Sequence, residues 1–188
     1  MRASGYALIE AVLVIIILGI LAVFIAPILS ATVSSYDTVS RNAEVLAKTR
    51  YAMERMAREI RNMRRDPKNS ARGDISTMTA SKFEFCSGDG TRVTLDAGAV
   101  PGEVRIGYTA GSLLTTCASG AVTTNRLTDL VQSANIFQYC KNDGVTCATS
   151  SGATVDELSV AFIDITMTLT GTGTNPYTST QRVDLRNP

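Results

Sequence analysis

A run of apolar residues near the start of the chain limits the fold more than any other feature. Between Ala11 and Tyr36 the only ionisable side chain is that of the tyrosine, and the segment AVLVIIILGILAVFIAPIL spans 19 residues. A helix needs about 20 predominantly apolar residues to cross a bilayer, so we expect a transmembrane helix here. A cleaved secretory signal is the alternative, but the apolar core of such signals is usually about 7–15 residues long. Leu29-Ser30-Ala31 also places Leu where the signal peptidase needs a small residue.

One carboxylate, that of Glu10, lies at the N-terminal end of this apolar run. A carboxylate at the centre of a membrane costs about 2.5–3.5 kcal/mol, which makes such residues candidates for function. Near the interface the cost is lower, and an interfacial Glu with no role is the simpler alternative. The sequence Gly5-Tyr6-Ala7-Leu8-Ile9 before Glu10, and the unbroken hydrophobicity after it, favour a role.

The stretch SGYALIEAVLVIIILGILA resembles the class III signal of type IV pilins and type II secretion pseudopilins. The resemblance implies that a prepilin peptidase cuts between Gly5 and Tyr6 and then methylates the new N-terminus on Tyr6. Glu10 would become the fifth residue of the mature chain. In this family that Glu attracts the positive N-terminal amine of a neighbouring subunit in the filament. Opposite charges attract strongly in a low-dielectric bundle, and each relieves the desolvation of the other.

The resemblance divides the N-terminal part into a leader (residues 1–5), a transmembrane and assembly helix (6–29) and a periplasmic amphipathic helix (30–65). Gly19 and Pro27 fall where pilins often carry residues that weaken or kink the helix. A proline removes one backbone hydrogen bond, so we expect a kink or local melting just before Pro27. Farther along, apolar residues recur every seven positions and predict one apolar helix face. These residues are Val39, Leu46, Met53 and Ile60, with Ala43 and Ala57 in the same stripe.

The rest of this periplasmic helix contains many charged residues. Glu44–Lys48 and Glu54–Arg58 have the spacing of stabilising helix pairs. The cations toward its end are Arg55, Arg58, Arg61, Arg64, Arg65 and Lys68. Binding of nucleic acid or anionic lipid is one interpretation, but aromatic residues for base stacking are missing beside the cluster. The net charge of only +1 also differs from that of a general nucleic-acid binder. We therefore interpret the cluster as a solvated face and expect no nucleic-acid partner.

From residue 66 to residue 188 the sequence predicts a β-rich globular domain. Short alternating runs indicate strands around Phe83–Phe85, Val93–Leu95, Val104–Tyr108, Phe137–Tyr139, Leu158–Leu169 and Val183–Leu185. Gly88-Asp89-Gly90 predicts a hairpin turn, and Ala110-Gly111-Ser112 a turn toward a run at Leu113–Cys117. In the run Leu158–Leu169 the apolar residues switch from one face of the strand to the other, which predicts a β-bulge near Phe162–Ile163. The fold class is therefore α+β, and the arrangement expected from the resemblance is the pilin fold, with the long helix packed on an antiparallel sheet.

All four cysteines, Cys86, Cys117, Cys140 and Cys147, lie in this β-rich domain. A zinc site would need all four thiolates at spacings of 31, 23 and 7, without a C-x-x-C motif and without histidine. Two disulfides are the better interpretation, and they require an oxidising compartment such as a bacterial periplasm. Four cysteines allow three pairings. A turn-rich loop between Cys140 and Cys147 favours a local bridge, which leaves Cys86 for Cys117.

Nothing in the composition supports an enzyme. The absence of His excludes catalysis and metal ligation by imidazole, and the acidic residues form no convincing catalytic pair. We expect no cofactor and no metal. Some pseudopilins bind calcium in loops like those of Asp89 and Asp143, but the spacing here does not match an EF-hand. Solvated turn residues are therefore the preferred interpretation of these two aspartates.

Within the family, the segment Arg41–Arg65 resembles minor pilins of the W/J type, especially those of the mannose-sensitive haemagglutinin (MSHA) pilus. This resemblance implies a low-copy subunit that starts a filament or occupies its tip. Its expected partners are other pilin subunits, the prepilin peptidase and an inner-membrane assembly platform. Its expected location is the bacterial inner membrane, single-pass with a periplasmic C-terminal domain, and then the pilus or pseudopilus. A major pilin, a secretion pseudopilin and a membrane-anchored periplasmic receptor or adhesin outside any filament are the alternatives.

Overall fold

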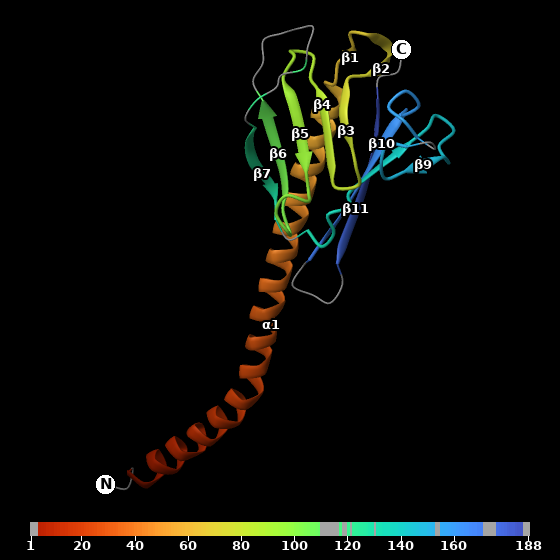
Figure 1. The fold of residues 1–188 in the computed structure, drawn as a ribbon. Coiled ribbons are helices and arrows are strands. Elements are labelled where there is room, and N and C mark those ends of the chain that lie inside the picture. Colours follow the sequence, from red (N-terminus) through yellow and green to blue (C-terminus); the bar gives the residue numbers. More distant parts are fainter. Residues whose placement is uncertain are drawn as a thin grey trace. The chain divides into compact units, whose positions relative to one another are not determined.

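The structure is a computed structural model that describes residues 4–109, 117, 120, 122–129, 131–152, 155–170 and 176–185. The chain divides into two compact units, Met1–Asn42 and Ala43–Pro188. The first unit is helical, and the second contains the remainder of the same helix and every described strand (Figure 1). The expected turn at residues 110–112 and residues 113–116 of the following run lie outside the described residues, as do residues 1–3 of the expected leader.

Helix α1 runs from Ser4 to Arg61. Gly19 and Pro27 both lie inside it, and the helix continues through both residues without interruption. A proline deletes one backbone hydrogen bond, but the turns on either side of Pro27 remain helical. The local melting that we expected just before Pro27 therefore does not occur.

The helix ends at Arg61 rather than at residue 65, which corrects the boundary expected from the sequence. The reason is a pair of backbone hydrogen bonds between the residues after Arg61 and the segment around Cys86 and Gly88. The N–H of Gly88 donates to the carbonyl of Asn62 (3.0 Å), and the N–H of Arg64 donates to the carbonyl of Cys86 (2.9 Å). These bonds replace the next helical turn, and strand β1 (Arg65–Asp66) begins immediately afterwards.

The globular unit contains two larger antiparallel sheets and a small one, where the sequence suggested a single sheet. The five-stranded sheet has the order β3 (Ile75–Met78), β4 (Lys82–Cys86), β5 (Arg92–Asp96), β6 (Val104–Thr109) and β7 (Thr123–Thr128). The four-stranded sheet has the order β11 (Tyr177–Asp184), β10 (Phe162–Leu169), β8 (Phe137–Cys140) and β9 (Cys147–Ala148). β1 pairs with β2 (Asn69–Gly73). The α+β class is thus as expected, and the hairpin at residues 88–90 joins β4 to β5 with Gly90 at a φ of 85°.

The β-bulge predicted near Phe162–Ile163 is wrong. β10 begins at Phe162 and pairs with β11 in continuous register. The preceding residues form a turn, in which the Asp156 carboxylate and carbonyl both accept the N–H of Ser159 (2.9 and 3.1 Å). The change of phase in the apolar pattern therefore marks the boundary between this turn and the strand.

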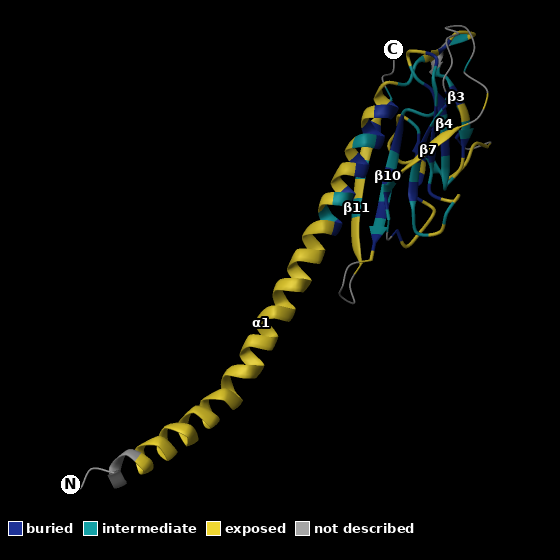
Figure 2. Ribbon diagram, turned by 90° about the vertical axis from the view of Figure 1, so that its left-hand side faces the viewer, coloured by how far each residue is buried: buried dark blue, intermediate teal, exposed yellow. Residues whose placement is uncertain are grey.

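The core lies among the two sheets and the part of α1 that belongs to this unit (Figure 2). Phe83 of β4 packs its ring 6.1 Å from that of Phe137 and 5.6 Å from that of Tyr139, both on β8, and so connects the two sheets. The buried apolar residues of α1 are Val45, Ala52, Met53, Met56, Ala57 and Ile60. Val39 and Ala43, which the seven-residue pattern placed on the same face, are exposed.

Candidate functional site

The helix of the first unit carries an exposed apolar surface. Between Leu8 and Leu29 its large apolar side chains are 47–71% exposed. Figure 2 colours this part of α1 as exposed. α1 is long and apolar enough to cross a membrane. Soluble proteins rarely expose continuous apolar surfaces of this extent, so a lipid phase or another protein is expected to cover it.

Glu10 lies in this surface among exposed apolar residues such as Ile9 and Leu13. In the described part of the first unit the only cation is Arg41, which forms an ion pair with Asp37 (3.1 Å). Glu10 has no ion-pair partner among the described residues. The Gly5–Tyr6 bond lies in the first turn of α1, where backbone N–H groups lack intrahelical acceptors. Tyr6 and Glu10 are one helical turn apart, about 6 Å along the axis.

Three of the hydroxyl residues that follow the apolar run form hydrogen bonds within the helix. The hydroxyls of Thr32, Ser34 and Thr38 donate to backbone carbonyls three or four residues earlier, at 2.8–3.0 Å. These bonds lower the cost of placing hydroxyls near a membrane interface. The helical segment between Glu10 and Asp37 is about 40 Å long, which exceeds the ~30 Å hydrocarbon core of a bilayer.

In the globular unit, a partly buried polar network joins α1 to the five-stranded sheet. The Tyr108 hydroxyl on β6 donates to the Glu59 carboxylate (2.8 Å) and accepts from the Arg55 guanidinium (2.8 Å). Arg55 and Glu59 also form an ion pair at 2.8 Å. Glu59 is 8% exposed. Burial, and then the hydrogen bond to Glu59, raise the pKa of Tyr108, so the hydroxyl stays protonated and fixes the helix on the sheet.

A second link joins α1 to the residue after β7. Lys48 bonds both Glu44 (2.9 Å) and Asp129 (3.1 Å). The hydrogen bond from Lys48 lowers the pKa of the Asp129 carboxyl. Glu44–Lys48 is thus the helix pair expected from the sequence. The expected Glu54–Arg58 pair is absent from the ion pairs of the described residues.

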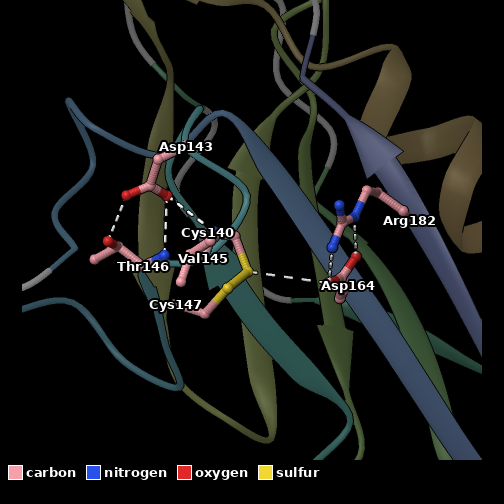
Figure 3. Close-up of a disulfide and its surroundings, with 7 residues drawn as sticks. All are labelled: Cys140, Asp143, Val145, Thr146, Cys147, Asp164 and Arg182. Carbon is pink, nitrogen blue, oxygen red and sulfur yellow. Dashed lines mark hydrogen bonds and ion pairs between the residues drawn. A yellow bond between two sulfur atoms is a disulfide. The ribbon is translucent and has the colours of Figure 1, made fainter.

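The two disulfides join Cys86 to Cys117 and Cys140 to Cys147, with Cα–Cα distances of 5.7 and 4.1 Å. Figure 3 shows the second, which closes the loop between β8 and β9. Within that loop, Asp143 accepts the backbone N–H groups of Val145 (3.0 Å) and Thr146 (2.9 Å) as well as the Thr146 hydroxyl. The Thr146 hydroxyl and these N–H groups lower the pKa of Asp143.

Both aspartates considered for calcium therefore act as turn acceptors. Asp89 accepts the N–H of Thr91 (3.0 Å), as Asp143 does those of its own loop. Within the part of the chain that the structure describes, His, Cys, Asp and Glu form no group of three or more that could hold a metal ion. Carboxylates already satisfied by their own turn have fewer lone pairs for a cation.

No known protein-family model matches the chain. No curated protein is detectably similar to it in sequence. Glu10 and the exposed apolar surface around it are the features of the described residues that bear most directly on function. Sequence reasoning missed the Glu59–Tyr108 contact, because the two residues are 49 positions apart and neither belongs to a motif.

Proposed function

We propose that this protein is a minor pilin or pseudopilin, a structural subunit that enters a type IV pilus or type II secretion pseudopilus through its N-terminal helix. The observation that carries the proposal is one carboxylate, Glu10, exposed in an otherwise apolar helix surface and one turn after Tyr6. The resemblance of the first residues to the class III signal gives this arrangement a function. The helix is both the membrane anchor and the surface for packing between subunits.

Cleavage between Gly5 and Tyr6 creates a positive amine one turn before Glu10. In the membrane this amine and the carboxylate of a neighbouring subunit attract each other, by about 4 kcal/mol at 4 Å and an effective dielectric constant near 20. Each charge also relieves the desolvation of the other. A subunit whose Glu10 is still unpaired is therefore attracted to the positive N-terminal amine of a subunit at the end of a growing filament.

The exposed apolar side chains provide the second part of the mechanism. Leaving the bilayer for the filament moves them from lipid to neighbouring helices, so close packing sets the gain rather than transfer from water. The charge pair then selects the axial register of the subunits. This division of roles explains why one charge persists in a segment that is otherwise apolar.

The globular domain suits a periplasmic location, because two disulfides need an oxidising compartment. The proposed partners are other pilin subunits, the prepilin peptidase and the inner-membrane assembly platform. The similarity of Arg41–Arg65 to W/J-type minor pilins favours a low-copy role in filament initiation or at the tip.

Mass spectrometry of the mature N-terminus tests the proposal. We expect a chain that begins at Tyr6 and carries one added methyl group in cells with the peptidase, and the unprocessed chain in cells without it. An intact Met1 in both strains would support the membrane-anchored receptor or adhesin. A cut near Ala31 that does not depend on the peptidase would indicate an ordinary secretory signal. Quantifying the chain in purified filaments then separates a minor from a major pilin.

A further inference from the structure

A cleft of about 430 Å³ lies in the globular unit between the last turns of α1 and strand β11. Glu54, Arg58, Arg61 and Asn62 of the helical side and Gln181 of β11 line it. α1 and β11 run side by side in both ribbon views (Figures 1 and 2). One end of the cleft is fixed, because the Asn62 carbonyl accepts the N–H of Gly88 at 3.0 Å.

The cleft contains two arginines that have no anionic partner among the described residues. Arg58 and Arg61 are exposed, and neither forms an ion pair with a described residue. Glu54, one turn before Arg58, also lines the cleft without pairing with either arginine. The spacing of three between Arg58 and Arg61 puts their side chains on one face of the helix. The lining thus offers two guanidinium groups near its Asn62 end and one carboxylate near the other.

Strand β11 presents a sheet edge beside this cleft. It is the terminal strand of the four-stranded sheet and pairs with β10 alone. Among the described residues, the outer row of its backbone N–H and C=O groups therefore has no strand partner. Proteins usually protect such edges with charges, prolines, bulges or short strands. β11 is 8 residues long and contains no proline. It has two charged residues: Arg182, which is held by Asp164 at 2.8 Å, and the exposed Asp184 at the end of the strand.

We propose that the cleft and the β11 edge form a docking site for an extended acidic segment of another polypeptide. The segment adds as a strand along β11 and places carboxylates against Arg58 and Arg61. In strand addition, main-chain hydrogen bonds give affinity and pockets for alternate side chains give specificity. Alternate residues of a strand lie about 7 Å apart, and the two arginines are about 4.5 Å apart along the helix axis, so two alternate carboxylates reach both guanidiniums.

A synthetic peptide tests this site without knowledge of the natural partner. The probe is a fluorescent, Thr- and Val-rich peptide with Glu at two alternate positions, and its binding to the full chain in detergent micelles is followed by fluorescence anisotropy. Two changed peptides accompany it, one with Gln in place of Glu and one with alternate backbone N-methyl groups along one edge. Losing a charge-assisted hydrogen bond corresponds to about a tenfold or greater loss of affinity. We expect such a loss for each changed peptide.

The protein variants separate this cleft from general charge attraction. R58Q/R61Q is expected to weaken binding of the acidic peptide about tenfold or more. R50Q/R65Q removes the same charge from two exposed arginines outside the cleft, and it should change affinity less than about twofold. Equal losses in the two double variants, full binding of the N-methylated peptide, or no binding to the wild type would each overturn the proposal. The comparison between peptides remains decisive even if a variant folds poorly, and none of these results depends on filament assembly.

Discussion

Removing the Tyr108 hydroxyl tests how strongly this polar network fixes α1 on the five-stranded sheet. Tyr108→Phe deletes the bond to Glu59 and the bond from Arg55, both 2.8 Å long. A hydrogen bond to a charged group contributes about 1.5–3 kcal/mol. The Arg55 side chain is 37% exposed and Glu59 keeps its ion pair with it, so water and that pair recover part of the loss. We therefore expect the free energy of unfolding to fall by about 2 kcal/mol.

The assay is urea unfolding of the full chain in detergent micelles, followed by near-ultraviolet circular dichroism. Tyr177→Phe is the matched control, because Tyr177 is 42% exposed and the same hydroxyl removed there should change stability by less than about 0.5 kcal/mol. Replacing both partners, as in Glu59→Met with Tyr108→Phe, should cost less than the sum of the two single changes. Equal effects of Tyr108→Phe and Tyr177→Phe, or strict additivity in the double variant, would refute the network.

Three further predictions concern the globular unit. Burial raises the pKa of Tyr139 above its ordinary value, so the stability that this residue contributes is complete below about pH 10 and declines as the pH rises further. Above that pH, the urea midpoint should fall more steeply with pH in the wild type than in Tyr139→Phe. Parallel curves of midpoint against pH would contradict this. The Cys140–Cys147 bridge closes a loop of separation 7, so replacing both residues with Ser should cost about 2 kcal/mol in the same assay, and no loss would count against a stabilising bridge. Gly107→Ala brings a Cβ against Val122 Cγ1 and should cost about 1–2 kcal/mol, whereas adding Val122→Ala should restore stability if that contact is the cause.

Local signals in the sequence predict the elements that depend on neighbouring residues. The β4–β5 hairpin follows from alternating apolar residues around Gly88-Asp89-Gly90, and the helix from a long apolar run and its amphipathic continuation. The charged pair Glu44–Lys48 forms at the expected helical spacing. Each of these features depends on contacts close in sequence, where spacing is informative.

Other features depend on contacts far apart in the chain. β7 is an edge strand with the polar sequence TTNRLT, and its residues 123–126 are exposed, so no apolar alternation marks it. The division into two sheets depends on which strands pair, and the helix end at Arg61 on bonds to Cys86 and Gly88. The cleft of Arg58 and Arg61 likewise requires β11, which lies more than a hundred residues later.

If the Glu10 charge brings subunits into the filament, the amount of a Glu10→Ala variant in purified filaments should reveal it. We expect normal processing and membrane insertion, with incorporation reduced about tenfold or more because the charge pair is lost. Asp37→Ala is the control, since it removes another exposed α1 carboxylate outside the apolar run and should assemble nearly normally. Normal incorporation of processed Glu10→Ala would contradict the charge-pairing account.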